Sequence, residues 1–146
     1  MKFKKNISVI LAVVMLICGN VIWVSATNQE IQPLYNNTLS TDVSFPITDS
    51  GIATVRIKVT GYSGVTKSIT VTSHIERKSF GLFWIKVNNG LSNDEWVDTS
   101  SSYLLNASHS LHLEKNGEYR AVVKFVISGS GGADDAFNQI VYSNYG

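Results

Sequence analysis

The sequence of 146 residues contains one cysteine, two prolines and few charged side chains, and each scarcity narrows the classes of protein that fit it. A single cysteine excludes a domain held together by internal disulfides, so the fold depends on packing alone. Charged residues make up 16% of the chain and form no basic run, which argues against nucleic acid or an anionic membrane as the partner. After residue 26 no stretch repeats its apolar residues with the period of a helix, so long helices are not expected either.

Residues 1–26 are predicted to be a secretory signal peptide. Three lysines within the first five residues precede an apolar run, Ile7–Ile17, and the segment ends on Val24-Ser25-Ala26. A cationic start, an apolar centre and small residues at the end are typical of such peptides, and we expect cleavage after Ala26. One alternative is an uncleaved membrane anchor over residues 7–24. Another is lipid attachment at Cys18, which the bulk of Ile17 disfavours.

The remaining chain has the length of one domain. Removing 26 of the 146 residues leaves 120, from Thr27 to Gly146. This part carries nine Lys and Arg against eleven Asp and Glu, a formal net charge of −2, and it has no cysteine. We expect residues 27–40 to be an N-terminal arm, because they are polar and show no periodicity, and residues 41–146 to be a single β-sandwich domain.

The clearest structural signal in this domain is a polar turn followed by a long stretch in which apolar and polar residues alternate. Leu113 precedes a turn that contains Asn116-Gly117, and Tyr119 begins a stretch with an apolar residue at every second position up to Ile127. The spacing Leu-x-x-x-Gly-x-Tyr resembles the tyrosine corner of immunoglobulin-like sandwiches, in which the phenol hydrogen-bonds to backbone a few residues upstream. The resemblance gives Leu113, Gly117 and Tyr119 a structural role.

Alternation of apolar and polar residues predicts strands along the rest of the domain. The predicted strands cover 41–47, 52–62, 67–77, 82–87, a segment that begins at 96, 119–129 and 137–142, with shorter apolar pieces at 103–105 and 111–113. Pro46 lacks an amide donor and therefore confines the first strand to a sheet edge. About seven or eight short strands at such spacings predict an all-β, antiparallel, two-sheet immunoglobulin-like sandwich.

Several motifs together resemble a family of small secreted proteins of Gram-positive bacteria with no assigned function. They are Tyr35-Asn36-Asn37-Thr38, Gly51-Ile52-Ala53, residues 59–67 with the alternating 69–72 that follow, and Gly117-Glu118-Tyr119-Arg120-Ala121. The resemblance covers nearly all of the chain after the signal peptide. It implies an exported immunoglobulin-like sandwich and transfers no catalytic residue. This sequence departs from the family in its aromatic-rich residues 80–87 and at Trp96.

The aromatic residues are the strongest candidates for binding, and two interpretations are open. In residues 82–87 either alternating set could be the buried one. In immunoglobulin-like sandwiches a Trp of the third main strand packs into the core, so we expect Trp84 there, and Trp96 as a second core filler. The alternative is a flat surface platform of Trp84, Trp96 and Tyr62, of the kind that stacks on sugars or on protein partners.

Three sequence patterns resemble catalytic or metal-binding motifs, and for each of them a purely structural interpretation is favoured. Gly129-Ser130-Gly131-Gly132 resembles the nucleophile loop of trypsin-like proteases, but Ser128 stands where an acidic residue belongs, so a mobile glycine hairpin tip is expected. His109 and His112 would point to opposite faces of a strand. Two loop clusters offer carboxylate oxygens without the spacing of a calcium loop and are interpreted as solvated charge: Asp94, Glu95 and Asp98, and Asp134, Asp135 and Asn138.

The sequence therefore predicts an exported, non-catalytic binding module that uses no metal or cofactor. Its expected partner is an extracellular protein or a cell-wall or polysaccharide ligand, not nucleic acid. An alternative from a different class is a small exported effector, similar in kind to a bacteriocin, that acts on the envelopes of other cells. The expected location is outside the cell, or at the cell membrane if the N-terminal segment is not cleaved.

Overall fold

The computed structural model describes residues 35–146, which lie within a compact unit spanning Leu34–Gly146. The predicted signal peptide with its cleavage after Ala26, the alternatives at residues 7–24 and at Cys18, and residues 27–34 of the predicted arm lie outside the described residues. In residues 35–146 no helix is long and apolar enough to cross a membrane.

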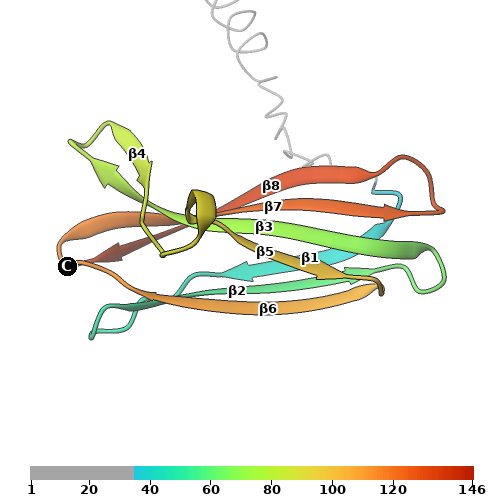
Figure 1. Cartoon of the computed structure of the whole chain (residues 1–146), viewed down its shortest axis with the longest axis horizontal. Coiled ribbons are helices and arrows are strands. Elements are labelled where there is room, and N and C mark those ends of the chain that lie inside the picture. Colours follow the sequence, from blue (N-terminus) through green and yellow to red (C-terminus); the bar gives the residue numbers. More distant parts are fainter. Residues whose placement is uncertain (1–34) are drawn as a thin grey trace, which may run out of the picture. The chain divides into compact units, whose positions relative to one another are not determined.

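Two antiparallel sheets pack against each other in this unit (Figure 1). The strands are β1 (Thr38–Ser44), β2 (Ile52–Gly61), β3 (Thr66–Ser79), β4 (Phe83–Lys86), β5 (Trp96–Ser100), β6 (Leu104–His112), β7 (Gly117–Gly129) and β8 (Asp135–Tyr145), with a short 3-10 turn η1 (Ser92–Asp94) before β5. One sheet has the order β1-β2-β6 and the other β4-β3-β7-β8, while β5 pairs with the middle of β3. The predicted all-β, two-sheet antiparallel sandwich is confirmed.

The core lies between the sheets and is built from alternate residues of the central strands. The fully buried apolar side chains include Val55 and Val59 of β2, Ile69 and Val71 of β3, and Phe125 of β7. Because side chains on a strand alternate between faces, each of these strands buries one set and leaves the other on the outer face. The inward sets predicted for these three strands are confirmed.

Strand boundaries differ from the prediction mainly where the inward residues are small or polar. The prediction gave two short pieces at 103–105 and 111–113, whereas β6 is one strand that pairs with β2 from Leu104 to His112. Its half-buried positions include Ala107 and His109, which weaken the apolar period that the prediction relies on. β1 lies at the edge of its sheet, as Pro46 indicated, but it begins at Thr38, within the predicted arm, and ends at Ser44, before the proline. Residues 38–40 therefore belong to the sandwich, because they pair with β2.

The corner between β6 and β7 contains the contacts that its sequence motif implies. Tyr119 is buried, and its hydroxyl donates to the carbonyl oxygen of Glu114 at 2.7 Å. Leu113 is also buried. Gly117 passes so close to the tyrosine ring that an added Cβ would lie 2.6 Å from Cε2 of Tyr119. Asn116 holds the left-handed conformation that the turn requires, with φ 60°. Leu113, Gly117 and Tyr119 thus meet in one packed corner.

Candidate binding surface

The three residues of the predicted aromatic platform lie apart. Tyr62 follows β2 in the turn that leads to β3, whereas Trp84 lies in β4; these two places are at opposite ends of the sheets in Figure 1. Trp96, at the start of β5, packs against the core and stacks face to face on His109, with ring centroids 5.0 Å apart. The structure therefore does not bring Tyr62, Trp84 and Trp96 together.

The prediction that Trp84 packs into the core is wrong. Trp84 pairs with Lys78 of β3, a position that faces away from the other sheet, and its ring does not join the buried cluster. The reason is the register of β4 against β3, which sets Trp84 opposite Lys78 on the outer face of the sheet. At this end of β3 the hairpin lifts away from the three-stranded sheet (Figure 1).

Trp84 instead belongs to a group of side chains on the outer face of the larger sheet, which we call the aromatic-cation cluster: Trp84, Tyr142, Arg120 and Lys78. The Trp84 and Tyr142 rings meet edge to face with centroids 5.7 Å apart. The guanidinium carbon of Arg120 lies 4.4 Å from the Trp84 ring centroid, and Nζ of Lys78 lies 5.8 Å from it. Both cations are within the range of a cation-π contact, so the exposed Tyr142 ring and the Trp84 ring are held in place.

Carboxylates fix the cations of this cluster. Glu76 accepts a hydrogen bond from Nε of Arg120 at 2.5 Å, and Nε2 of His74 lies 3.2 Å from its other oxygen. Burial alone would raise the pKa of Glu76, but the hydrogen bonds from Arg120 and His74 outweigh it and hold the pKa below its ordinary value. Glu76 is therefore ionised at neutral pH and orients Arg120 over the indole.

The hairpin between β3 and β4 carries the largest group of exposed apolar side chains in residues 35–146. We call it the apolar tip: Phe80, Leu82, Phe83 and Ile85, which are exposed by 91, 75, 63 and 56%. Exposed apolar residues are common singly, whereas four of them on one short hairpin make this hairpin the candidate contact surface.

The turn of this hairpin holds a bulky residue in an unfavourable conformation. Phe80 has φ 52° and Gly81 has φ 70°, and the amide of Leu82 donates to the carbonyl oxygen of Ser79 at 3.1 Å. Two successive left-handed residues form the type I′ turn that favours Asn-Gly. Phenylalanine in this region is an outlier that costs free energy locally. Because the Phe80 side chain is almost fully exposed, no packing in the described residues offsets that cost.

A ring of basic residues surrounds the base of the hairpin, and each has a carboxylate partner. Arg77 pairs with Glu114, Lys78 with Glu118 at 2.7 Å, and Lys86 with Glu95 at 2.6 Å. The hydrogen bond from Lys86 lowers the pKa of Glu95, so this pair is ionic at neutral pH. We call Arg77, Lys78 and Lys86 the basic collar; its charges are balanced by the paired glutamates.

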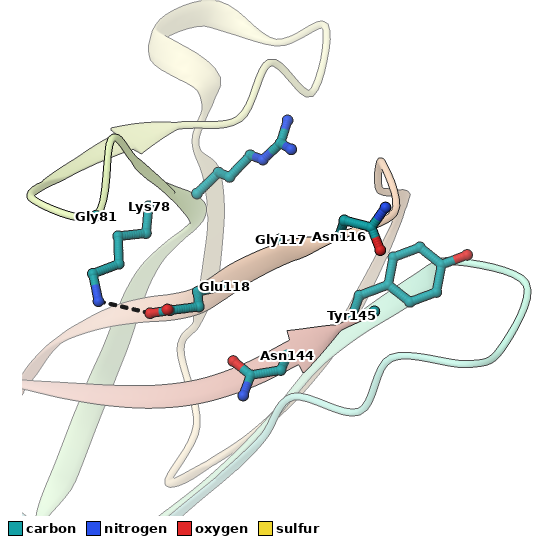
Figure 2. Close-up of a pocket in the computed structure, with 9 residues that line it drawn as sticks. Lys78, Gly81, Asn116, Gly117, Glu118, Asn144 and Tyr145 are labelled. Atoms are coloured by element: carbon teal, nitrogen blue, oxygen red, sulfur yellow. Dashed lines mark hydrogen bonds and ion pairs between the residues drawn. The ribbon is translucent and has the colours of Figure 1, made fainter.

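Two hollows lie beside the hairpin. The larger, about 620 Å³, lies between the hairpin and the tyrosine corner and is lined in part by Phe80, Ile85 and Tyr119. The smaller, about 360 Å³, is lined by Lys78, Gly81 and the end of β8. Figure 2 shows Lys78 reaching from the hairpin to Glu118 across this smaller hollow, with Asn144 and Tyr145 beside it. Charged and polar atoms thus lie at the base of the hairpin, and apolar atoms lie at its tip.

The histidine pair does not form a site. His109 lies on the half-buried side of β6, stacks on Trp96 and has its Nε2 2.8 Å from Oδ2 of Asp98, whereas His112 is exposed. The two rings are separated as the strand offset predicts. Among residues 35–146 no three His, Cys, Asp or Glu side chains are grouped so that they could hold a metal ion.

The carboxylate of Asp135 is buried, so its interpretation as solvated loop charge is wrong. It accepts hydrogen bonds from the amides of Asn36 and Asn37 and from the hydroxyl of Thr38, at 2.7 to 2.9 Å. Burial alone would raise the pKa of Asp135, but these donors outweigh it and lower the pKa. The carboxylate therefore joins the start of the β-domain to β8.

The glycine-rich link between β7 and β8 is packed and does not form the free tip that was expected. The Asn37 side chain donates to the carbonyl oxygen of Ala133 and accepts from the amide of Gly131. An added Cβ at Gly131 would lie 2.1 Å from the carbonyl oxygen of Asn36, so only glycine fits. The hydroxyl of Ser130 donates to the carbonyl oxygen of Val65. Nothing in this arrangement activates Ser130 as a nucleophile.

The sequence prediction missed the apolar tip and the partners of Trp84. A usable signal was present, since residues 82–87 are apolar on both alternating faces and neither set could be chosen as the buried one. When a short strand is apolar on both faces, its sequence indicates that it does not have one face on the core and the other in water. Arg120 and Tyr142 carried no such signal, because their contact with Trp84 depends on the pairing of β3 with β7 and of β7 with β8.

Comparisons of this chain with family models, with curated proteins and with solved structures found no match. The surface described above is therefore the basis for proposing a function.

Proposed function

We propose that the protein is an exported, non-catalytic interaction module that contacts its partner outside the cell through the β3–β4 hairpin. The observation that carries this proposal is the apolar tip, whose four large side chains are exposed by 56 to 91% on a hairpin that lifts away from the sandwich. Water is a poor solvent for such a group, so a partner that covers it gains the hydrophobic free energy of all four side chains.

The scaffold is, in this proposal, an immunoglobulin-like sandwich. The order β1-β2-β6 corresponds to strands A, B and E of that fold, and β3-β7-β8 to strands C, F and G. The tyrosine corner at the start of β7 agrees with this assignment. In residues 35–146, however, no fourth strand extends the three-stranded sheet, and β4 and β5 both pair with β3. The hairpin thus occupies an irregular part of the fold, where variation affects the framework least.

A non-catalytic role fits the state of the candidate reactive groups. Ser130 donates to a backbone carbonyl, His109 is stacked against an indole, and Asp135 is saturated with donors. A second candidate function, an exported effector that acts on the envelopes of other cells, is favoured by the same tip, because a hairpin that is apolar on both faces is suited to insertion. That candidate additionally predicts growth inhibition or leakage of exposed cells.

The test is co-sedimentation of residues 27–146 with insoluble cell-wall material, with polysaccharides and with whole envelope fragments of Gram-positive cells, monitored by tryptophan fluorescence. The double variant Phe80→Ser, Phe83→Ser removes half of the apolar tip. Leu39→Ser is the matched control, because Leu39 is 59% exposed on β1, away from the hairpin. The proposal predicts that the protein and the control pellet with at least one fraction and that the double variant does not. Pelleting that is equal for all three, or absent for all three, contradicts it.

A further inference from the structure

We propose that the apolar tip enters the boundary region of a lipid bilayer, with the basic collar and Trp84 at the level of the lipid headgroups. This inference rests on the proposed function and names the class of its partner. Four observations lead to it: the distribution of apolar side chains around the hairpin, the strained turn, the composition of the hairpin base, and the balance of its charges.

The apolar side chains lie on both faces of the hairpin. Trp84 lies on the outer face with Lys78, Phe83 and Ile85 are on the opposite face, and Phe80 and Leu82 are exposed in the turn that joins the strands. A groove on a protein partner covers one face of a hairpin and leaves the other in water. Hydrocarbon surrounds an inserted hairpin on every side, so a tip that is apolar on both faces matches a bilayer better than a groove.

The strained turn places the most exposed side chain at the extreme end of the hairpin. Phe80 is 91% exposed with φ 52°, at a position where asparagine or glycine would adopt the same backbone at less cost. A strained backbone under a bulky, exposed side chain is the kind of outlier that leads to a functional proposal for that side chain. At the end of a projecting hairpin, that side chain is the first to reach an apolar phase.

The base of the hairpin has the composition of a membrane interface. Tryptophan and long basic side chains are favoured at the headgroup level, where an apolar body contacts acyl chains and a polar end stays hydrated. Trp84 and the lysines of the basic collar, Lys78 and Lys86, occupy this position next to the apolar tip. Ile85 pairs with Arg77 at the same level, so Phe80, Leu82 and Phe83 are the side chains that lie beyond it toward the turn. The collar and Trp84 thus limit the depth of insertion to the end of the hairpin.

The charges of the collar do not select anionic lipid. Each of its three cations is paired with a glutamate, so the hairpin base is close to neutral. The tip therefore has to bind through burial of apolar area, and the binding should persist on zwitterionic lipid and at high salt. This also agrees with the absence of a basic run in the sequence, which argues against an electrostatic attachment to anionic membranes.

The experiment uses vesicles of phosphatidylcholine alone and residues 27–146, so that the predicted signal peptide does not itself bind lipid. Trp84 provides the signal in a Trp96→Phe background, because these are the only two tryptophans after residue 26. We expect pelleting with the vesicles and a blue shift of Trp84 emission. We also expect at least about a tenfold loss of affinity in Phe80→Ser, Phe83→Ser, and none in Leu39→Ser.

Several outcomes would overturn the proposal. These are absence of binding to neutral vesicles, equal losses in the double variant and the Leu39→Ser control, and binding that requires anionic lipid and disappears between about 0.1 and 1 M salt. Self-association of the free protein that depends on Phe80 and Phe83 would assign the tip to a second copy of the chain. If vesicles fail while pelleting with wall material still depends on the tip, the bilayer proposal falls and the proposed function stands.

Discussion

The β7–β8 link and the β3–β4 hairpin are both connections between neighbouring strands of the same sheet, and their sequences follow opposite rules. In the β7–β8 link, glycine stands where the backbone approaches Asn36 closely, and Asp135, the first residue of β8, is buried among three donors. In the hairpin, Phe80 holds a backbone conformation that suits asparagine or glycine, and its side chain is left in water. The buried contacts of one connection serve the fold, whereas in the other a strained phenylalanine is left exposed without packing from the described residues.

The largest effect on stability should come from the link. Asp135→Ala leaves two backbone amides and the Thr38 hydroxyl without their acceptor in a buried site. Because hydrogen bonds to a charged acceptor are the stronger ones, we expect a loss of about 3 kcal/mol in the free energy of unfolding, measured by urea denaturation. Asp134→Ala, at the exposed neighbouring position, is the control and should change it by less than about 0.5 kcal/mol.

The same carboxylate should contribute to acid unfolding. The pKa of Asp135 in the folded state lies below the ordinary value of 3.8, so its stabilisation is present above that value and is lost as the pH falls through the folded pKa. In Asp135→Asn this contribution is missing at every pH. The difference in unfolding free energy between the protein and this variant should therefore be largest near neutral pH and shrink below about pH 4. A difference that stays constant down to pH 2 would show that the Asp135 carboxylate does not contribute to acid unfolding.

A smaller loss is expected at the tyrosine corner, close to the hairpin. In Gly117→Ala the new methyl group would meet the ring of Tyr119 at 2.6 Å, so the corner must shift. Overpacking of this kind costs about 2 kcal/mol, and thermal denaturation would measure it. An unchanged melting temperature would show that the corner is looser than its contacts indicate.

The sequence was informative wherever one face of a strand is buried. Alternation located β2, β3 and β7 and their inward residues, because the core imposes a period of two on the strands that line it. Alternation was less informative for β6, where Ala107 and His109 occupy half-buried positions, and for β4, where both faces are apolar.

The aromatic-cation cluster could not be predicted beyond Trp84 itself. Its other members come from β3, β7 and β8, and their meeting depends on the register between those strands, which a local pattern does not encode. The burial of Asp135 was missed for the same reason. Its donors Asn36, Asn37 and Thr38 are almost one hundred residues earlier in the chain, with separations of 97 to 99 positions.

The smallest expected change in stability, and the most informative one, is at the turn of the hairpin. Phe80→Asn places a residue that tolerates φ 52° at the strained position and removes the most exposed apolar side chain. If the tip serves the fold, this variant should lose stability. If the tip serves a contact, the variant should be as stable as the protein, or more stable by up to about 1 kcal/mol, and should bind less well.

The most direct test of this account is therefore the affinity of Phe80→Asn for neutral phosphatidylcholine vesicles, with its urea midpoint recorded on the same preparation. We expect weaker binding together with a midpoint that is unchanged or higher. Unchanged binding, or a clearly lower midpoint, would contradict the claim that Phe80 is retained for a contact outside the fold.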